Sequence, residues 1–265
     1  PGSPTSFRME RDSDMGAPVS GNIIGEVTAA SAGNVVLATW NAYAAISQNL
    51  GRTWAYYNPA TLFAWSGNDF GGFCCDQVAY YDQSHDIMIW ILQFSPNGSG
   101  NNAIRVAWSK GASSVAAATF CYTNLTPQQL GNTYGPTGTN YDQPKFARSD
   151  NYYYLEIQRY GATSGSTVIK FAVSGLSWPT CGGFNYSFYI PGTYSPGMVQ
   201  RANGTMFFAG HVNTSTLRVY QWPEAGSDKF TDYTDPADVK ITDQGAITIA
   251  FVPAGTDIAK PATIA

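Results

Sequence analysis

The chain repeats a unit of short apolar runs that are separated by turn residues. The unit that begins at Asp76 shows the pattern, with runs over 76–81, 87–93 and 103–109. The runs are rich in aromatic and β-branched residues, and none of useful length has the helical period. Comparable units cover approximately residues 23–60, 76–125, 142–190 and 196–240. The repeat therefore predicts an all-β chain assembled from similar modules.

Each unit contains three clear strands and room for a fourth, and the units recur about every 50 to 65 residues. That spacing is typical of the four-stranded antiparallel blades of a β-propeller, whose stacked sheets bury both faces. An N-terminal extension at 1–22 precedes the units, and a further blade is expected to start within 246–265. Because propellers of about six or seven blades are common, we expect this sequence to be an incomplete part of one. A β-sandwich of similar strand content is the alternative.

One hairpin carries a sharper signal than the repeat itself. Residues 47–54 read Ser-Gln-Asn-Leu-Gly-Arg-Thr-Trp, which resembles the Asp-box, Ser-x-Asp-x-Gly-x-Thr-Trp, of the sialidase-like (BNR-repeat) β-propeller family. Asn49 stands where that family has Asp, and an Asn side chain can also accept hydrogen bonds from a turn backbone. Gly51 permits a positive φ, and Trp54 can pack back beneath the hairpin. The resemblance implies that Ser47, Asn49, Gly51 and Trp54 shape the turn between the third and fourth strands of a blade.

The resemblance does not extend to the catalytic residues of sialidases. That family uses an arginine triad, a Tyr/Glu nucleophile pair and an Asp acid/base. Residues 7–10, Phe-Arg-Met-Glu, are only faintly similar to the Phe-Arg-Ile-Pro motif that supplies the first arginine, and they lack its proline. We therefore carry over no sialidase active-site residue, and a true sialidase is not expected, since a fold alone does not confer a function.

The dipeptide Asp-Gln begins two consecutive units, at Asp76 and Asp142. Inner strands of a propeller begin near the central channel, so these carboxylates are the candidate catalytic pair for acid/base work on a glycosidic bond. They could instead bind Ca²⁺, which prefers oxygen ligands, or simply staple adjacent blades. Tyr80 and Arg201 are candidate ligand-binding residues, since sugar rings stack on aromatic faces. Two scattered histidines form no metal cluster or catalytic triad.

The cysteines indicate two disulfides. Cys74, Cys75, Cys121 and Cys181 form an even set with three possible connectivities, and no CxxC spacing suggests zinc. Because a bond between adjacent residues strains the chain, we expect the neighbouring pair to bond outward to Cys121 and Cys181.

Composition limits the partners and the compartment. The net charge of −4, with no Lys/Arg run, argues against nucleic acid, and no apolar stretch is long enough for membrane insertion. Only 12% of residues are charged. Five glycosylation triplets occur, at Asn97, Asn124, Asn185, Asn203 and Asn213. Together with paired cysteines, these features favour a secreted, extracellular protein.

Two functions remain open at this level. The first is a secreted propeller that binds or processes extracellular carbohydrate; if it is an enzyme, we expect a glycoside hydrolase without a required cofactor, although Ca²⁺ could bind. The second is a non-enzymatic cell-surface, adhesion or assembly protein that uses the propeller as a structural module and self-associates.

Overall fold

The computed structural model describes residues 26–63, 69–132, 138–213 and 216–234. The expected N-terminal extension at 1–22, with the motif at 7–10, and the expected start of a further blade at 246–265 lie outside these residues.

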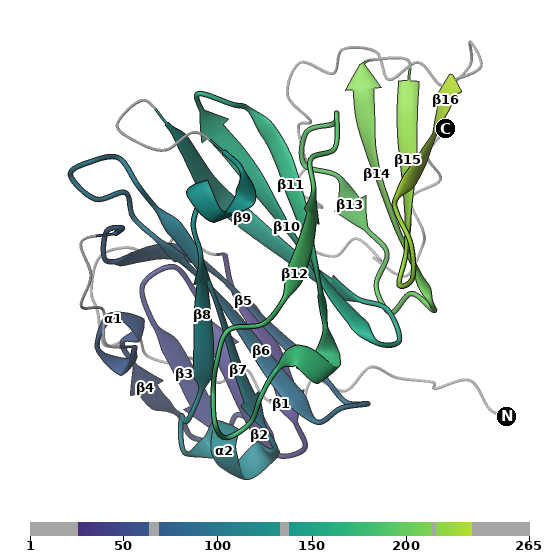
Figure 1. Cartoon of the computed structure of the whole chain (residues 1–265). Helices are drawn as coiled ribbons and strands as arrows, with labels where there is room; N and C mark the ends of the chain where they lie inside the picture. The colour runs from purple at the N-terminus through teal and green to yellow at the C-terminus, as the bar shows by residue number, and fades with distance from the viewer. Residues whose placement is uncertain (1–25, 64–68, 133–137, 214–215, 235–265) are drawn as a thin grey trace, which may run out of the picture.

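Four antiparallel sheets of four strands each make up the described chain (Figure 1). The first sheet contains β1 (Thr28–Ala32), β2 (Val35–Thr39), β3 (Ala44–Ser47) and β4 (Ala55–Tyr57). The second contains β5 (Phe73–Asp82), β6 (Ile87–Phe94), β7 (Ala103–Lys110) and β8 (Cys121–Leu125). The third contains β9 (Thr139–Arg148), β10 (Tyr152–Gly161), β11 (Gly165–Ala172) and β12 (Tyr186–Tyr189). The fourth contains β13 (Gly197–Met198), β14 (Thr205–Asn213), β15 (Thr216–Pro223) and β16 (Lys229–Thr234). Short helices α1 (Pro59–Leu62) and α2 (Ala112–Ala116) and the 3-10 turns at Gln128–Leu130 and Val173–Gly175 lie between strands.

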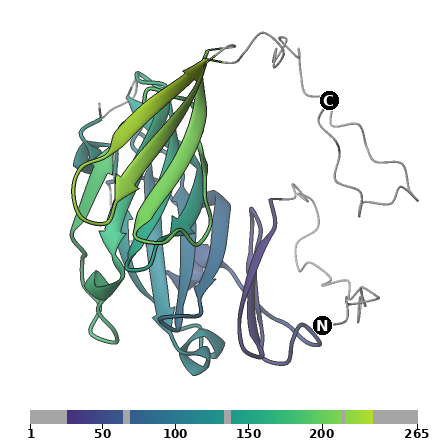
Figure 2. The same ribbon diagram turned by 90° about the vertical axis from the view of Figure 1, so that its right-hand side faces the viewer.

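Every sheet is a meander in which strands follow one another in chain order. The first strands of neighbouring sheets lie side by side: the Ala79 amide of β5 donates to Thr28 Oγ1 of β1 at 2.8 Å, and Gln200 Nε2, beside β13, donates to the Phe146 carbonyl of β9 at 3.0 Å. Figure 2 shows the sheets fanned around one side of the molecule. The all-β prediction and the blade arrangement of a β-propeller are confirmed, whereas a two-sheet sandwich is not what forms.

Both faces of the second sheet are buried, and β6 shows why its sequence does not alternate. All eight residues of β6 are buried. Met88, Trp90 and Leu92 pack toward the first sheet, while Ile89 and Ile91 pack toward the third. A strand covered on both faces reads as a continuous apolar run, as 87–92 does.

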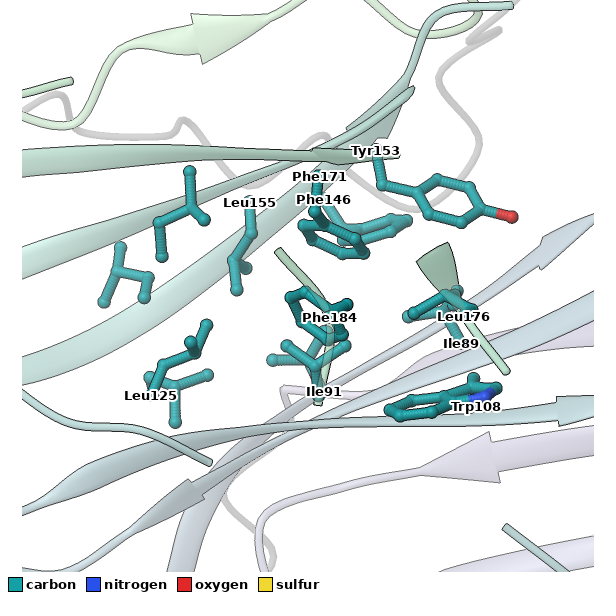
Figure 3. Packing of buried hydrophobic residues seen from close by; sticks show 14 of the residues in the cluster. Ile89, Ile91, Trp108, Leu125, Phe146, Tyr153, Leu155, Phe171, Leu176 and Phe184 are labelled. Atoms are coloured by element: carbon teal, nitrogen blue, oxygen red, sulfur yellow. The ribbon is translucent and has the colours of Figure 1, made fainter. Parts of the chain in front are cut away.

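The largest apolar cluster lies between the second and third sheets (Figure 3). Ile91 and Trp108 from the second sheet face Phe146 and Phe171 from the third, and the Phe184 ring stacks on Phe171 with centroids 4.4 Å apart. A smaller cluster joins the third and fourth sheets through residues such as Tyr154 and Trp222. Each pair of neighbouring sheets therefore has its own core.

The hairpin at 47–54 has the geometry that its sequence predicts. It connects β3 to β4, and Asn49 Oδ1 accepts hydrogen bonds from the Thr53 amide at 2.9 Å and from Ser47 Oγ at 3.0 Å. Ser47 Oγ in turn accepts the Gly51 amide at 2.8 Å. Gly51 has φ of +82°, and a Cβ there would lie 3.3 Å from the Trp54 ring. Asn49 therefore accepts hydrogen bonds within the turn, as its side chain was expected to do.

The expected disulfide pairing is wrong. The structure joins Cys74 to Cys75 and Cys121 to Cys181. Cys74 and Cys75 lie at the start of β5, whereas Cys121 begins β8 three strands away and pairs with Trp108 at the other end of that sheet. Two cysteines at opposite ends of a sheet cannot reach the Cα separation of under about 7 Å that a disulfide requires.

A buried carboxylate fastens the second sheet to the third. Asp82, at the end of β5, is fully buried and accepts hydrogen bonds from Tyr153 Oη of β10 at 2.9 Å and from the Ser84 amide at 3.0 Å. His85 Nδ1 lies 2.7 Å from Asp82 Oδ2, and Arg148 Nε of β9 lies 3.5 Å from Oδ1. Burial raises the pKa of the Tyr153 hydroxyl, so this group remains a donor.

We expect Tyr153→Phe to lower the free energy of unfolding by about 1 to 2 kcal/mol, because a buried charged acceptor loses one donor. Urea unfolding measures the change. The adjacent Tyr152→Phe is the matched control, since Tyr152 is only half-buried, and a change within about 0.5 kcal/mol is expected there. Equal losses in both variants would contradict a specific role for the Asp82 contact.

Candidate active site

Three carboxylates lie near the starts of the first strands of three neighbouring sheets. Glu26 precedes β1, Asp76 lies in β5 and Asp142 lies in β9. Asp76 lies close enough to Glu26 and Asp142 for both carboxyl groups to raise its pKa, and close enough to the Gln143 amide for that group to oppose the shift. The structure therefore brings together the two aspartates proposed from the sequence and adds a third acidic group to them.

Irregular strand pairing sets the position of both aspartates. In β5, the register with β6 shifts between Phe73 and Gln77, so Asp76 falls within a bulge. In β9, Asp142 pairs with Gln158, beside a second register shift in β10 between Glu156 and Gln158. Bulges turn a side chain away from the direction that regular pleating would give it, and they are frequent beside functional sites.

Two buried amide side chains hold the backbone on either side of this pair. Gln77 Nε2 donates to the Tyr43 carbonyl at 3.1 Å and its Oε1 accepts Trp90 Nε1 at 2.8 Å, which fixes the residue after Asp76. Asn102 accepts the Tyr141 amide at 3.0 Å and donates to the Tyr141 carbonyl at 2.7 Å, which fixes the residue before Asp142. Such support from surrounding side chains is what a preorganised site requires.

The two Asp-Gln dipeptides are not equivalent, although they look alike in the sequence. Gln77 is buried and ties the second sheet to the first, while Gln143 is exposed and has φ of +45°. The Gln143 amide donates to Asp142 Oδ1 at 3.0 Å. The side chain of Gln77 therefore holds neighbouring strands together, whereas Gln143 contributes a backbone hydrogen bond to Asp142.

The environment of Asp76 favours its protonated form. Partial burial, the adjacent Glu26 carboxyl group, and the nearby negative charge of Asp142 raise the pKa of Asp76 from 3.8 to about 7. The Gln143 amide opposes this shift. A carboxyl group with a pKa near 7 can donate a proton at neutral pH and recover it afterwards.

A polar network extends from Asp142 toward the fourth sheet. Gln158 Nε2 donates to Ser195 Oγ at 2.6 Å, and its Oε1 accepts Tyr194 Oη at 3.0 Å and Tyr160 Oη. Burial and a hydrogen bond to Tyr194 raise the pKa of Tyr160. These hydroxyl and amide groups can hydrogen-bond to a hydroxyl-rich ligand placed beside Asp142.

An ion pair between the partly exposed Lys145 and the buried Glu156 lies along the same strands. Lys145 Nζ is 3.4 Å from Glu156 Oε2 and donates to the Ser195 carbonyl at 3.1 Å. Burial raises the pKa of Glu156, while the nearby Ser166 hydroxyl and the Lys145 ammonium oppose the shift. The pair joins β9 and β10 to the loop that leads into the fourth sheet.

Tyr80 and Arg201 lie together, but away from the aspartates. Both line a cavity of about 430 Å³ beside β1 and β5. Tyr80 is four residues beyond Asp76 on β5, which corresponds to about 13 Å along a strand. Burial raises the pKa of Tyr80, and Arg148 and Arg201 oppose that shift. The two proposed ligand-binding residues thus line the same cavity, and the candidate catalytic pair lies elsewhere on the strands.

Sequence reasoning missed several members of the site. Glu26 could have been proposed from the sequence, because it is an acidic residue near the start of a unit, as Asp76 is. Gln158, Tyr160 and Tyr194 gave no local signal, because the third sheet and the following loop bring them together only after folding.

The described part of the chain can be searched for metal-binding groups and for membrane-spanning helices. Within those residues, no group of three or more His, Cys, Asp or Glu side chains is arranged to hold a metal ion, so the Ca²⁺ alternative gains no site there. None of the described helices is long and apolar enough to cross a bilayer.

Comparisons with known proteins leave the family open. No protein-family model matches the chain, and no curated protein matches it. A crystal structure of an exo-β-1,3-galactanase from Phanerochaete chrysosporium, bound to galactose, is similar at 12% identity with a TM-score of 0.40. The match covers 78% of this chain and 49% of that one, so this chain spans about half the length of that enzyme. The likeness is too low to assign a family or an activity, and none of these comparisons supports membership of the sialidase-like family.

The raised pKa of Asp76 predicts a pH effect on stability. The folded chain binds this proton more tightly than the unfolded chain, whose Asp titrates near 3.8. The resulting stabilisation is complete below about pH 4 and is lost as the pH rises through about 7. In urea unfolding, we expect wild-type stability to decline between pH 5 and pH 8 more than that of Asp76→Asn. The exposed Asp150→Asn variant should retain the wild-type decline, and identical profiles for all three proteins would contradict the shift.

Proposed function

We propose that this protein processes extracellular carbohydrate as a glycoside hydrolase, with Asp76 and Asp142 as its catalytic carboxyl groups. The observation that carries the proposal is the group of three acidic side chains from successive first strands, in which the pKa of Asp76 is raised to about 7. Glycosidic bond cleavage ordinarily needs one carboxylic acid that is protonated and one carboxylate.

The environments of the two aspartates suggest their roles. Protonated Asp76, assisted by Glu26, transfers its proton to the glycosidic oxygen as the bond between the sugar carbon and that oxygen breaks. Asp142, whose Oδ1 accepts the Gln143 amide, acts as the carboxylate. It either takes a proton from the attacking water or bonds to the sugar carbon until water replaces it.

Neighbouring hydroxyl groups support a sugar as the ligand. Tyr160 and Tyr194 have hydroxyl oxygens 2.6 Å apart, and the aromatic rings form an edge contact. Aromatic faces and phenolic hydroxyls suit the mixed apolar and polar surface of a pyranose. The hairpin at 47–54 adds support for a propeller of the sialidase-like kind, without any sialidase active-site residue.

An extracellular setting is part of the proposal. The two disulfides fit an oxidising compartment. Among the five triplets, Asn185, Asn203 and Asn213 are exposed. Asn97 and Asn124 are half-buried and use their side-chain oxygens internally; Asn97 Oδ1 accepts the Ser99 amide and Asn124 Oδ1 accepts Arg105 Nε, at 2.9 and 2.8 Å.

The fourth sheet gives an observation that favours the second candidate, a non-enzymatic adhesion or assembly module. Val199, Phe207 and Val212, on or beside β14, are exposed large apolar residues. Phe207 alternates with the buried Met206 and Phe208, so it points away from the third sheet. An exposed apolar face of this kind is typical of a surface that contacts another protein.

We expect Asp76→Asn and Asp142→Asn each to lower the rate of oligosaccharide cleavage by at least about 100-fold, because each removes a group that transfers a proton or supports the reacting carbon. Initial rates on a panel of α- and β-linked oligosaccharides measure the loss. The exposed Asp86→Asn is the matched control and should cleave like the wild type. Full activity in either catalytic variant, or no cleavage of any panel member by the wild type, would contradict the proposed reaction.

Expression through a eukaryotic secretory pathway should add glycans at Asn185, Asn203 and Asn213, because a bulky glycan needs an exposed side chain. Peptide mapping by mass spectrometry after enzymatic deglycosylation locates the modified residues. Occupancy confined to Asn97 and Asn124 would overturn the expected order, and no occupancy at any triplet would count against the secreted setting.

A further inference from the structure

A second cavity lies between the second and third sheets, at the opposite end from the carboxylates. It has a volume of about 330 Å³ and is lined on one side by His85, Trp108 and Lys110. Asn151, Ser174 and Trp178 line the other side. The strand β5 separates it from the candidate active site, since Asp76 and Asp82 are six residues apart, or about 20 Å along a strand. The volume is at the small end of the range for ligand pockets, about 300 to 1,000 Å³.

The histidine in this cavity is fixed by the buried carboxylate of Asp82. His85 Nδ1 lies 2.7 Å from Asp82 Oδ2, while Tyr153 Oη and the Ser84 amide donate to the same carboxylate. This contact places the proton of a neutral ring on Nδ1, so Nε2 is left as a hydrogen-bond acceptor for another partner. No described residue bonds to Nε2, and the side chain is 33% exposed. A histidine held in this way has an oriented polar atom available to a ligand.

The tryptophans are fixed as well. Trp108 Nε1 donates to the Ser177 carbonyl at 2.9 Å, and Figure 3 shows the Trp108 ring beside Leu176 at one end of the core. The disulfide from Cys121 to Cys181 fastens the segment that contains Trp178 to the second sheet. Both rings are therefore held in place before any ligand binds, which lowers the entropic cost of binding.

The charged side chain that lines the cavity is basic. Lys110 is exposed at the end of β7, and no acidic residue is among those that line the cavity. Asp82 lies behind His85, and its carboxylate already accepts hydrogen bonds from Tyr153 and from the Ser84 amide. The half-buried Trp178 ring suits the apolar face of a sugar ring. The Lys110 ammonium suits a carboxylate, and Nε2 of His85 can accept a hydrogen bond from a sugar hydroxyl.

We propose that this cavity is a second carbohydrate-binding site, specific for a pyranose that carries a carboxylate, such as a uronic acid residue. The ring packs against Trp178, the carboxylate faces Lys110, and a hydroxyl of the sugar donates to Nε2 of His85. The site does not depend on hydrolysis at Asp76 and Asp142. A polysaccharide with acidic residues could be held here while another part of it occupies the candidate active site.

Isothermal titration calorimetry with trigalacturonate and with neutral galactotriose tests the proposal. We expect trigalacturonate to bind at least about tenfold more tightly, which corresponds to roughly one charge-assisted contact. Lys110→Gln should remove most of that preference, and His85→Ala should weaken trigalacturonate binding by about tenfold. Lys110 is exposed, so its variant should fold normally; thermal unfolding checks both proteins.

The chain offers matched controls. Lys229→Gln and His211→Ala change an exposed lysine and the other histidine, both in the fourth sheet, and should leave binding unchanged. Asp76→Asn should also bind normally, which separates this site from the proposed catalytic function. Equal affinity for the two trisaccharides, binding that survives His85→Ala and Lys110→Gln, or no heat of binding for the wild type would each overturn the proposal.

Discussion

Strand β6 is buried along its whole length, because the first sheet covers one face of it and the third sheet covers the other. This double coverage is the physical constraint on which the remaining structure depends. A sheet with two apolar faces is stable only between two others, so the chain has to place its meanders one after another. Their first strands then run side by side, and residues at equivalent positions of successive units become neighbours. Glu26, Asp76 and Asp142 meet for this reason.

The same constraint explains how much of the fold could be predicted from the sequence. Continuous apolar runs such as 87–92 and the polar turns between them predict stacked meanders, because a strand buried on both faces needs no alternation. The hairpin at 47–54 was readable residue by residue, since its hydrogen bonds are local. The disulfide pairing was not, because it depends on which end of the second sheet each cysteine occupies. Cys74 and Cys121 lie at opposite ends, a property of strand direction and register and not of sequence spacing.

The candidate site was readable only in part, for a related reason. Repetition identified Asp76 and Asp142, but it could not show that Gln77 and Gln143 play different structural roles. Register shifts determine the direction of those side chains, and a bulge leaves only weak signals in the local sequence. Beside Asp142 the one such signal is Pro144, which has no backbone N–H to donate to a neighbouring strand. Tyr80 and Arg201 were both identified and do share a cavity, yet distance along β5 separates them from the aspartates. The candidate ligand-binding residues therefore lie apart from the candidate catalytic pair.

The bond between Cys121 and Cys181 connects strand β8 of the second sheet to the loop before β12 of the third. Among the described residues it is the disulfide that crosses between blades, since Cys74 and Cys75 bond within one strand. The two middle blades are therefore covalently linked to each other, while the described outer blades are held to them by noncovalent contacts and the connecting chain. Breathing motions that part neighbouring sheets should accordingly occur at the outer junctions first, and the middle pair should move as a single rigid body.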